Sequence, residues 1–201
     1  MVDDGKVGDY EVSSSLRIGK RTVFLCENGN APEGQKYGCG FAECNELFER
    51  YSEVEVSDDY MEIIKLYSAR ISGEVQAMEA ELSGLDVPLS VIGKEECYPN
   101  DYSEGIKGKV VAIRADVLLP EYRSADKQIY LVTGGFGAEA NARGRAVYCT
   151  NLHTGKTTRF DREDVQGVIK PECMPEWAAN SRYLPGGMDQ PKKNKNKDYE
   201  R

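Results

Sequence analysis

The sequence predicts an α+β protein, with N-terminal strands and one long amphipathic helix packed on a small, bent antiparallel β-sheet or barrel. Two observations predict this class. Residues 58–82 repeat apolar side chains at helical spacing. Residues 109–169 consist of short β-type runs separated by glycine turns. We divide the chain into four parts: a disordered N-terminus (1–16), a strand-and-helix part (17–93), a β-rich part (106–178) and a disordered Lys-rich tail (185–201).

The strand-and-helix part begins with a predicted hairpin. Residues 1–16 are polar and rich in serine, which predicts little order. Arg21–Cys26 is a compact β-type run, and Glu27–Gly34 holds the Asn, Gly and Pro residues typical of a turn. Lys36–Cys44 is therefore expected to return as the second strand.

A helix is predicted from about Asp58 to Leu82. Ser57 is a favourable N-cap, and the acidic residues after it lie at the positive end of the helix. Gly84 is a plausible stop. Apolar residues lie on one face at intervals of four and three: Tyr60, Ile64, Tyr67, Ile71, Val75, Met78 and Leu82. This stripe is expected to pack against a sheet, and a dimer seam is the alternative.

The β-rich part alternates apolar runs with turns. The Gly134–Gly137 cluster lacks the Gly-Lys-Ser or Gly-Lys-Thr ending of a phosphate-binding loop. It predicts a tight turn with positive φ and a β-bulge. The runs that predict strands are Val110–Ile113, Gln128–Val132, Ala146–Cys149 and Val165–Ile169.

The composition limits the classes of function. Charged residues make up 30% of the chain, and the formal net charge is −8. This charge argues against sequence-independent duplex binding, which depends on Lys and Arg. It favours a basic partner, such as a protein with its own nucleic-acid site. No apolar run approaches the roughly 20 residues that span a bilayer, and no secretory signal opens the chain, which predicts a cytoplasmic protein without a membrane partner.

No catalytic residue, cofactor or metal is predicted. The six cysteines form no CxxC pair and are expected to be reduced thiols. A zinc site of Cys26, Cys39, Cys44 and His153 is the alternative. His153 is the only histidine and lies at a predicted hairpin tip, where no nucleophile accompanies it.

Two groups of residues are predicted to bind a partner. The acidic stretch from residue 43 to 62 has a carboxylate density that imitates a phosphate track, although a solvated face is the simpler interpretation. Its candidates are Glu49, Glu53, Glu55 and Asp59. The second group lies in the glycine loop and the arginines after it, namely Gly135, Phe136, Arg143 and Arg145.

A resemblance rests on turn and strand residues between Lys109 and Ala178. The segments concerned include Gly134–Gly137, Arg143–Tyr148, Arg162–Asp164 and Pro175–Ala178. Here the chain resembles a module of mobile elements of Firmicutes, found in proteins with antirestriction or anti-CRISPR-type anti-defence functions. The resemblance implies a genomic setting and transfers no catalytic residue.

These observations predict a non-enzymatic anti-defence protein. It would bind a host RNA-guided nuclease or another defence nuclease, with the guide RNA or DNA as a further partner, and block the nucleic-acid site. One alternative is a nucleic-acid-binding or -cleaving protein that uses tyrosines and arginines as a stacking patch, with His153 or Asp161 and Asp164 in the chemistry. Another is an adaptor in a mobile-element complex. The patch would contain Tyr122, Tyr130, Tyr148, Arg123, Arg143 and Arg145.

Overall fold

The computed structural model describes residues 5–44 and 49–185. It divides the chain into two compact units, Met1–Asp86 (unit 1) and Val87–Arg201 (unit 2). The α+β class is confirmed, with one long helix and curled antiparallel sheets. Among the described helices, none has the length and apolar character that crossing a membrane requires.

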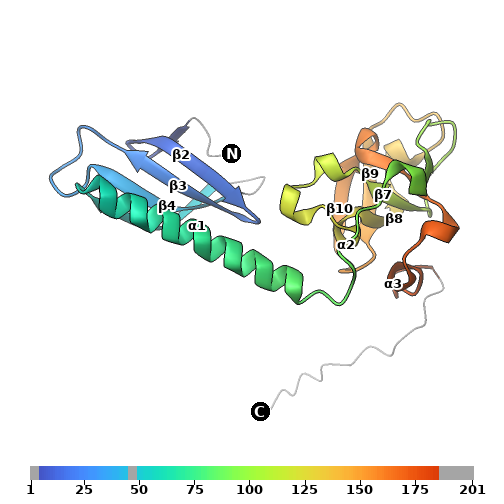
Figure 1. Ribbon diagram of the computed structural model, residues 1–201. Coiled ribbons are helices and arrows are strands. Elements are labelled where there is room, and N and C mark those ends of the chain that lie inside the picture. Colours follow the sequence, from blue (N-terminus) through green and yellow to red (C-terminus); the bar gives the residue numbers. More distant parts are fainter. Residues whose placement is uncertain (1–4, 45–48, 186–201) are drawn as a thin grey trace, which may run out of the picture. The chain divides into compact units, whose positions relative to one another are not determined.

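Unit 1 contains a five-stranded antiparallel meander (Figure 1). The predicted hairpin is confirmed, and two glycines in its second strand make room for side chains of the first. Gly40 lies opposite Phe24, and a Cβ at Gly40 would lie 2.6 Å from the Phe24 ring. The strands, in spatial and chain order, are β1 (Lys6–Val7), β2 (Tyr10–Ile18), β3 (Arg21–Glu27), β4 (Tyr37–Cys44) and β5 (Glu49–Ser57).

Three strands of unit 1 differ from the prediction. Residues 6–7 and 10–16, expected to be disordered, belong to β1 and β2, and β2 pairs with β3 along most of its length. The serines of β2 gain partners there, because Ser14 Oγ lies 3.1 Å from the Tyr67 hydroxyl. Residues 1–4 lie outside the described residues. Strand β5 was not predicted, since its acidic residues conceal the alternation with Val54 and Val56.

A β-bulge interrupts the pairing of β5 with β4. The register shifts so that Glu53 and Val54 together lie opposite Gly40. Glu53 adopts a positive φ of 52°, which is uncommon for a residue with a side chain. Strand β5 is the last strand of the sheet as described, so the bulge lies at the edge of the sheet.

The predicted helix is α1 (Tyr60–Ser83). Its N-cap is Asp59 and not Ser57: the Asp59 carboxylate accepts hydrogen bonds from the N–H groups of Met61 and Glu62 at 2.8 and 3.2 Å. The helix packs on the sheet of its own unit, where Ile63 joins a core of Val23, Leu25, Cys39 and Phe41.

Unit 2 contains a six-stranded, wholly antiparallel sheet (Figure 1). Its spatial order is β10 (Thr157–Asp161), β9 (Ala146–Asn151), β8 (Ile129–Gly134), β7 (Val110–Ile113), β11 (Val165–Ile169) and β6 (Cys97–Pro99). The four predicted strand runs are confirmed. Short helices α2 (Ala125–Gln128) and α3 (Glu176–Ala179) complete the unit, with 3-10 turns at Lys94–Glu96, Ala115–Val117, Pro120–Tyr122, Phe136–Ala138, Arg162–Asp164 and Pro171–Cys173.

Side chains cover both faces of this sheet. Ile129 and Leu131 belong to one core cluster, while Tyr130 and Val132 belong to the other. Ile92 and Cys97 also belong to the first cluster, so the boundary between the units falls at Asp86 and Val87. The prediction assigned residues 87–93 to the first part (17–93), whereas in the structure they belong to unit 2. The predicted disordered tail, 185–201, lies outside the described residues from 186 onward.

Candidate partner-binding surfaces

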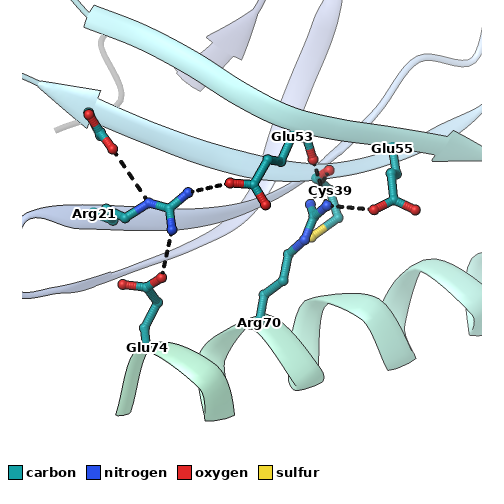
Figure 2. Close-up of polar contacts among 7 residues, drawn as sticks. Arg21, Cys39, Glu53, Glu55, Arg70 and Glu74 are labelled. Carbon is teal, nitrogen blue, oxygen red and sulfur yellow. Dashed lines mark hydrogen bonds and ion pairs between the residues drawn. The ribbon is translucent and has the colours of Figure 1, made fainter. Parts of the chain in front are cut away.

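Arg21 of β3 is surrounded by carboxylates from three other elements (Figure 2). Its guanidinium lies 2.9 Å from both Glu53 and Glu74, and 3.5 Å from Glu43, where the contact is an ion pair too long for a good hydrogen bond. The guanidinium carbon also lies 3.6 Å from the centroid of the Phe41 ring. Three carboxylates against one cation leave this site with net negative charge.

Arg70 of α1 fastens the helix to two strands. It is only 9% exposed, and its guanidinium donates to the backbone carbonyls of Cys39 and Glu53 at 2.6 and 2.5 Å. A third bond reaches the Glu55 carboxylate at 2.8 Å (Figure 2). A buried cation needs such partners, because leaving it unpaired in the interior is costly.

The predicted acidic residues therefore take part in the fold. The carboxylates of Glu53 and Glu55 face solvent yet bind Arg21 and Arg70, and Asp59 caps the helix. Glu49 lies in β5 opposite Cys44, and its side chain lies outside the described residues. Replacing these residues by Lys would damage the fold as well as any binding surface, so the hypothesis of phosphate mimicry needs other variants.

Asp58 has a structural role as well. Its carboxylate accepts hydrogen bonds from the N–H groups of Gly34 and Lys36, at 2.7 and 3.0 Å. These bonds to the backbone hold the pKa of Asp58 below its ordinary value. The carboxylate thus anchors the long turn between β3 and β4 next to the start of α1.

The negative charge is concentrated in unit 1. Residues 1–86 contain 18 Asp and Glu against 8 Lys and Arg, a net charge of −10. Residues 87–201 contain 16 against 18, a net charge of +2. Unit 1 therefore accounts for more than the whole net charge of the protein.

The glycine loop of unit 2 presents one aromatic side chain to solvent. Phe136 is 84% exposed. The turn has the predicted positive φ, 104° at Gly135, and the predicted bulge lies between Val132 and Gly134. A Cβ at Gly135 would collide with the Ala146 carbonyl, and one at Gly144 would lie 2.6 Å from Phe136 Cβ. The two sides of the loop therefore lie close together beside Phe136.

The predicted arginines of this loop have different surroundings. Arg143 is exposed, whereas Arg145 forms ion pairs with Asp161 at 2.9 Å and with Glu163. Arg159 also binds Asp161 at 2.9 Å. Much of the local positive charge is therefore neutralised, and the exposed ring of Phe136 remains the clearest binding feature.

Arg162 supports the loop from beneath, a role that the sequence does not reveal. It is 2% exposed and donates to the Gly137 carbonyl at 3.0 Å, to Asn100 Oδ1 at 2.8 Å and to the Glu104 carbonyl at 3.2 Å. It lines a cavity of about 480 Å³ beside Tyr98, and its guanidinium donates to neutral acceptors, so it acts as a structural clamp.

The alternative stacking patch does not assemble as predicted. Tyr130 is buried and packs edge-on against Phe160, with 5.0 Å between ring centroids. The Lys127 ammonium group lies 5.4 Å from the centroid of the Tyr122 ring. Tyr148 is exposed, and it lies opposite Arg159 in the sheet. Of the three predicted tyrosines, Tyr148 is thus the one placed to meet a ligand near Phe136.

The residues considered for chemistry also have structural partners. His153 packs edge-on against Trp177, with 5.7 Å between ring centroids. Asp164 accepts the N–H of Asp161 at 2.8 Å. Burial raises the pKa of the Cys26 thiol to about 11, which keeps it protonated at neutral pH. Within the described ranges, no three His, Cys, Asp or Glu residues gather closely enough to hold a metal ion.

Comparison of the chain with protein-family models, with curated proteins and with solved structures finds no match. The function must therefore be argued from the acidic surface of unit 1 and the Phe136 loop of unit 2.

Proposed function

We propose that this is a non-enzymatic, cytoplasmic anti-defence protein of anti-CRISPR or antirestriction type, which binds a host nuclease and blocks its nucleic-acid site. The observation that carries the proposal is the net charge of −10 on unit 1. A site that holds nucleic acid neutralises phosphates with Lys and Arg, so an acidic surface of similar size complements it. The resemblance of residues 109–178 to anti-defence modules supports the same function.

The ion-pair network of unit 1 suits this role because it fixes carboxylates in place. Glu53 and Glu55 remain exposed while Arg21 and Arg70 hold them. A carboxylate accepts several hydrogen bonds, so each can also accept one from a partner's cation. Phe136 supplies an apolar anchor of the kind that contributes most to protein interfaces.

The first test is a pull-down of the purified protein against an RNA-guided nuclease, with and without guide RNA, followed by a DNA-cleavage assay. Stable binding with loss of cleavage supports the proposal, and dependence on the guide shows which nucleic-acid site is blocked. Binding without loss of cleavage would instead favour an adaptor role.

Variants must avoid the carboxylates that hold the fold. We choose Glu11, Glu27 and Glu33, which are exposed in unit 1, and replace all three by Lys. The matched control reverses the exposed Glu139, Glu172 and Glu176 of unit 2. The unit 1 variant is expected to inhibit at least tenfold more weakly than the control. Equal inhibition by the two variants would contradict the acidic-surface mechanism.

One observation favours a second function, direct binding of single-stranded nucleic acid by unit 2. Phe136 and Tyr148 are both exposed, and unit 2 has a net charge of +2. Exposed aromatic rings can stack on bases. This function predicts salt-dependent binding of a single-stranded oligonucleotide, measured by fluorescence anisotropy, that is lost in Phe136→Ala and weakened in Arg143→Ala.

A further inference from the structure

Unit 2 contains a cavity that the proposed function does not use. It has a volume of about 480 Å³ and lies beside strand β6, with Tyr98 and Asn100 in its wall. The most buried residue of the wall is Arg162, which is 2% exposed. The volume is within the range of roughly 300–1,000 Å³ that is typical of small-molecule sites. The cavity is therefore large enough for a ligand.

Arg162 does not use all of its hydrogen-bond donors in the fold. A guanidinium carries five N–H groups. Nε donates to Asn100 Oδ1, Nη1 to the Gly137 carbonyl and Nη2 to the Glu104 carbonyl. Nη1 and Nη2 each have a second N–H group, and the described part of the chain provides no acceptor for either of them. Because a buried donor without a partner is costly, Arg162 favours a ligand that brings an acceptor.

Asp101 offers the complementary group at the exposed side of the cavity. Its Oδ1 accepts hydrogen bonds from the Ser103 hydroxyl and N–H, at 2.7 and 3.0 Å. These bonds hold the pKa of Asp101 below its ordinary value, and the charge of the nearby Arg162 adds to the effect. The carboxylate is thus ionised at neutral pH. Both bonds go to Oδ1, which leaves Oδ2 able to accept from a ligand.

The charges around the cavity balance. The charged residues that line it are two cations, Arg162 and Lys109, and two carboxylates, Asp101 and Glu104. The Lys109 ammonium group and the Glu104 carboxylate already form an ion pair with each other, 2.8 Å apart. A site without net charge favours a neutral group, and this one suits a group with both acceptors and donors.

The remaining wall residues favour a flat ring. The Tyr98 side chain is 51% exposed, and an exposed aromatic ring can stack on a base. Ile106 and Val168 add apolar side chains to the wall. A flat, neutral group with acceptors and donors on its edges is a nucleobase. Guanine fits best, because O6 and N7 accept while N1–H and the N2 amino group donate. Adenine presents an amino group in place of O6.

We infer that this cavity binds a guanine base, with its acceptors toward Arg162, its donors toward Asp101 and its face on Tyr98. The site goes beyond the proposed function, because it takes a small group in unit 2 and requires no nuclease. The base can belong to a free nucleotide or to an unpaired residue of single-stranded RNA, since both present the same edges and face.

The test is isothermal titration calorimetry of the full chain with guanosine, inosine and adenosine monophosphates (GMP, IMP and AMP). The three share ribose and phosphate, so differences in affinity report the base. GMP is expected to bind at least tenfold more tightly than AMP, which presents a donor to Arg162. IMP keeps O6 but lacks the N2 amino group, so its affinity is expected to lie between the other two.

Three variants test the walls of the cavity. Asp101→Asn keeps an Oδ1 acceptor for Ser103 but replaces Oδ2 by a donor, so it is expected to abolish the preference for GMP over IMP. Glu172→Gln, which removes an exposed carboxylate outside the cavity, is expected to keep that preference. Tyr98→Ala is expected to weaken GMP and AMP by a similar factor, about tenfold.

Equal affinity for GMP and AMP, no binding of any of the three, or a preference that Asp101→Asn leaves unchanged would overturn the inference. The ranking of the nucleotides is measured on the unmodified protein, so it remains decisive if a variant fails to fold. Phe136→Ala is expected to leave the affinity for GMP unchanged, which separates this site from the exposed ring of the glycine loop.

Two oligonucleotides distinguish the sources of the base. One is a single-stranded RNA of about ten adenines, and the other has guanine at its centre. Tighter binding of the second, with an affinity at least equal to that of GMP, assigns the site to an unpaired guanine of RNA. Binding of GMP without such a difference assigns it to a free nucleotide. Both outcomes support the guanine site.

Discussion

Arg70 is the residue on which the attachment of α1 to its sheet depends most. A single guanidinium satisfies two backbone carbonyls and one carboxylate, and a shorter or uncharged side chain cannot reach all three. The neighbouring Arg21 organises three carboxylates in the same region. The carboxylates that bind these two arginines therefore have a structural role.

Replacing Arg70 by Met is expected to lower the free energy of unfolding by about 3 kcal/mol, because it leaves buried carbonyls without donors. Urea denaturation measures this change. Arg70→Lys keeps the charge but lacks the planar fork, so it should recover less than half of the loss. A loss below about 0.5 kcal/mol would show that the guanidinium is not needed at this site.

Asp58 is expected to make the stability of unit 1 depend on pH in the acid range. Its pKa is lower in the folded protein than in the unfolded chain. The stabilisation it provides is therefore complete above the unfolded value of about 4, and it is lost as the pH falls through the folded value. In a plot of the free energy of unfolding against pH, the fall on the acid side (the acid limb) should be less steep for Asp58→Ala. Urea denaturation at a series of pH values measures it. An acid limb that is as steep in Asp58→Ala as in the unmodified protein would contradict this account.

The glycine loop shows how an element can separate stability from binding. Phe136 is exposed, so Phe136→Ala should change the melting temperature little while weakening binding to the nuclease at least tenfold. Gly135→Ala should instead destabilise unit 2 by about 2 kcal/mol, because of its positive φ and the collision with Ala146. Thermal unfolding and the pull-down measure the two effects. Similar effects of both changes on stability would contradict this division.

In the C-terminal turns of α1, a substitution is expected to stabilise the protein. Glu79→Gln should raise the free energy of unfolding by about 0.3–1 kcal/mol, because it removes negative charge from the negative end of the helix. Glu62→Gln, in the first turn, should lower it, since a carboxylate there favours the positive end and binds Ser57 Oγ at 2.7 Å. If both ends responded alike in urea denaturation, the electrostatic account of this helix would be wrong.

The elements differ in how far the sequence predicts them. Helix α1 and strands β3 and β4 were predicted because their apolar spacing is clear. Strand β2 was missed because serines, whose hydroxyls find partners only after pairing, occupy much of it. The candidate site was predicted less well than the fold. Phe136 was identified, but no local pattern reveals that Glu53 and Glu55 bind Arg21 and Arg70, which lie far away in the sequence.

On the scale of the whole molecule, the division of charge between the units is the main feature. Unit 1 is strongly acidic, and unit 2 is close to neutral. The sequence analysis did not identify this difference in net charge, because the charges of each unit can be counted only when the boundary at Asp86 is known. A partner with a basic surface is therefore attracted mainly to unit 1.

Binding to the nuclease is expected to weaken by about tenfold or more between 50 and 300 mM NaCl, since salt screens exposed charges. The dissociation constant measured across this range checks the expectation. The Glu11, Glu27 and Glu33 to Lys variant should show a shallower dependence than the unit 2 control. An affinity that does not change with salt would mean that the acidic surface does not drive association.

The bulge at Glu53 also affects how the protein behaves at high concentration. Strand β5 exposes Val54 and Val56 at the edge of its sheet, a combination that favours edge-to-edge pairing between molecules. The extra residue bends the strand and breaks the regular row of backbone groups, so a second chain cannot continue the ladder along its full length. We therefore expect the bulge to hinder the stacking of molecules into fibres at high concentration, even though these valines are exposed.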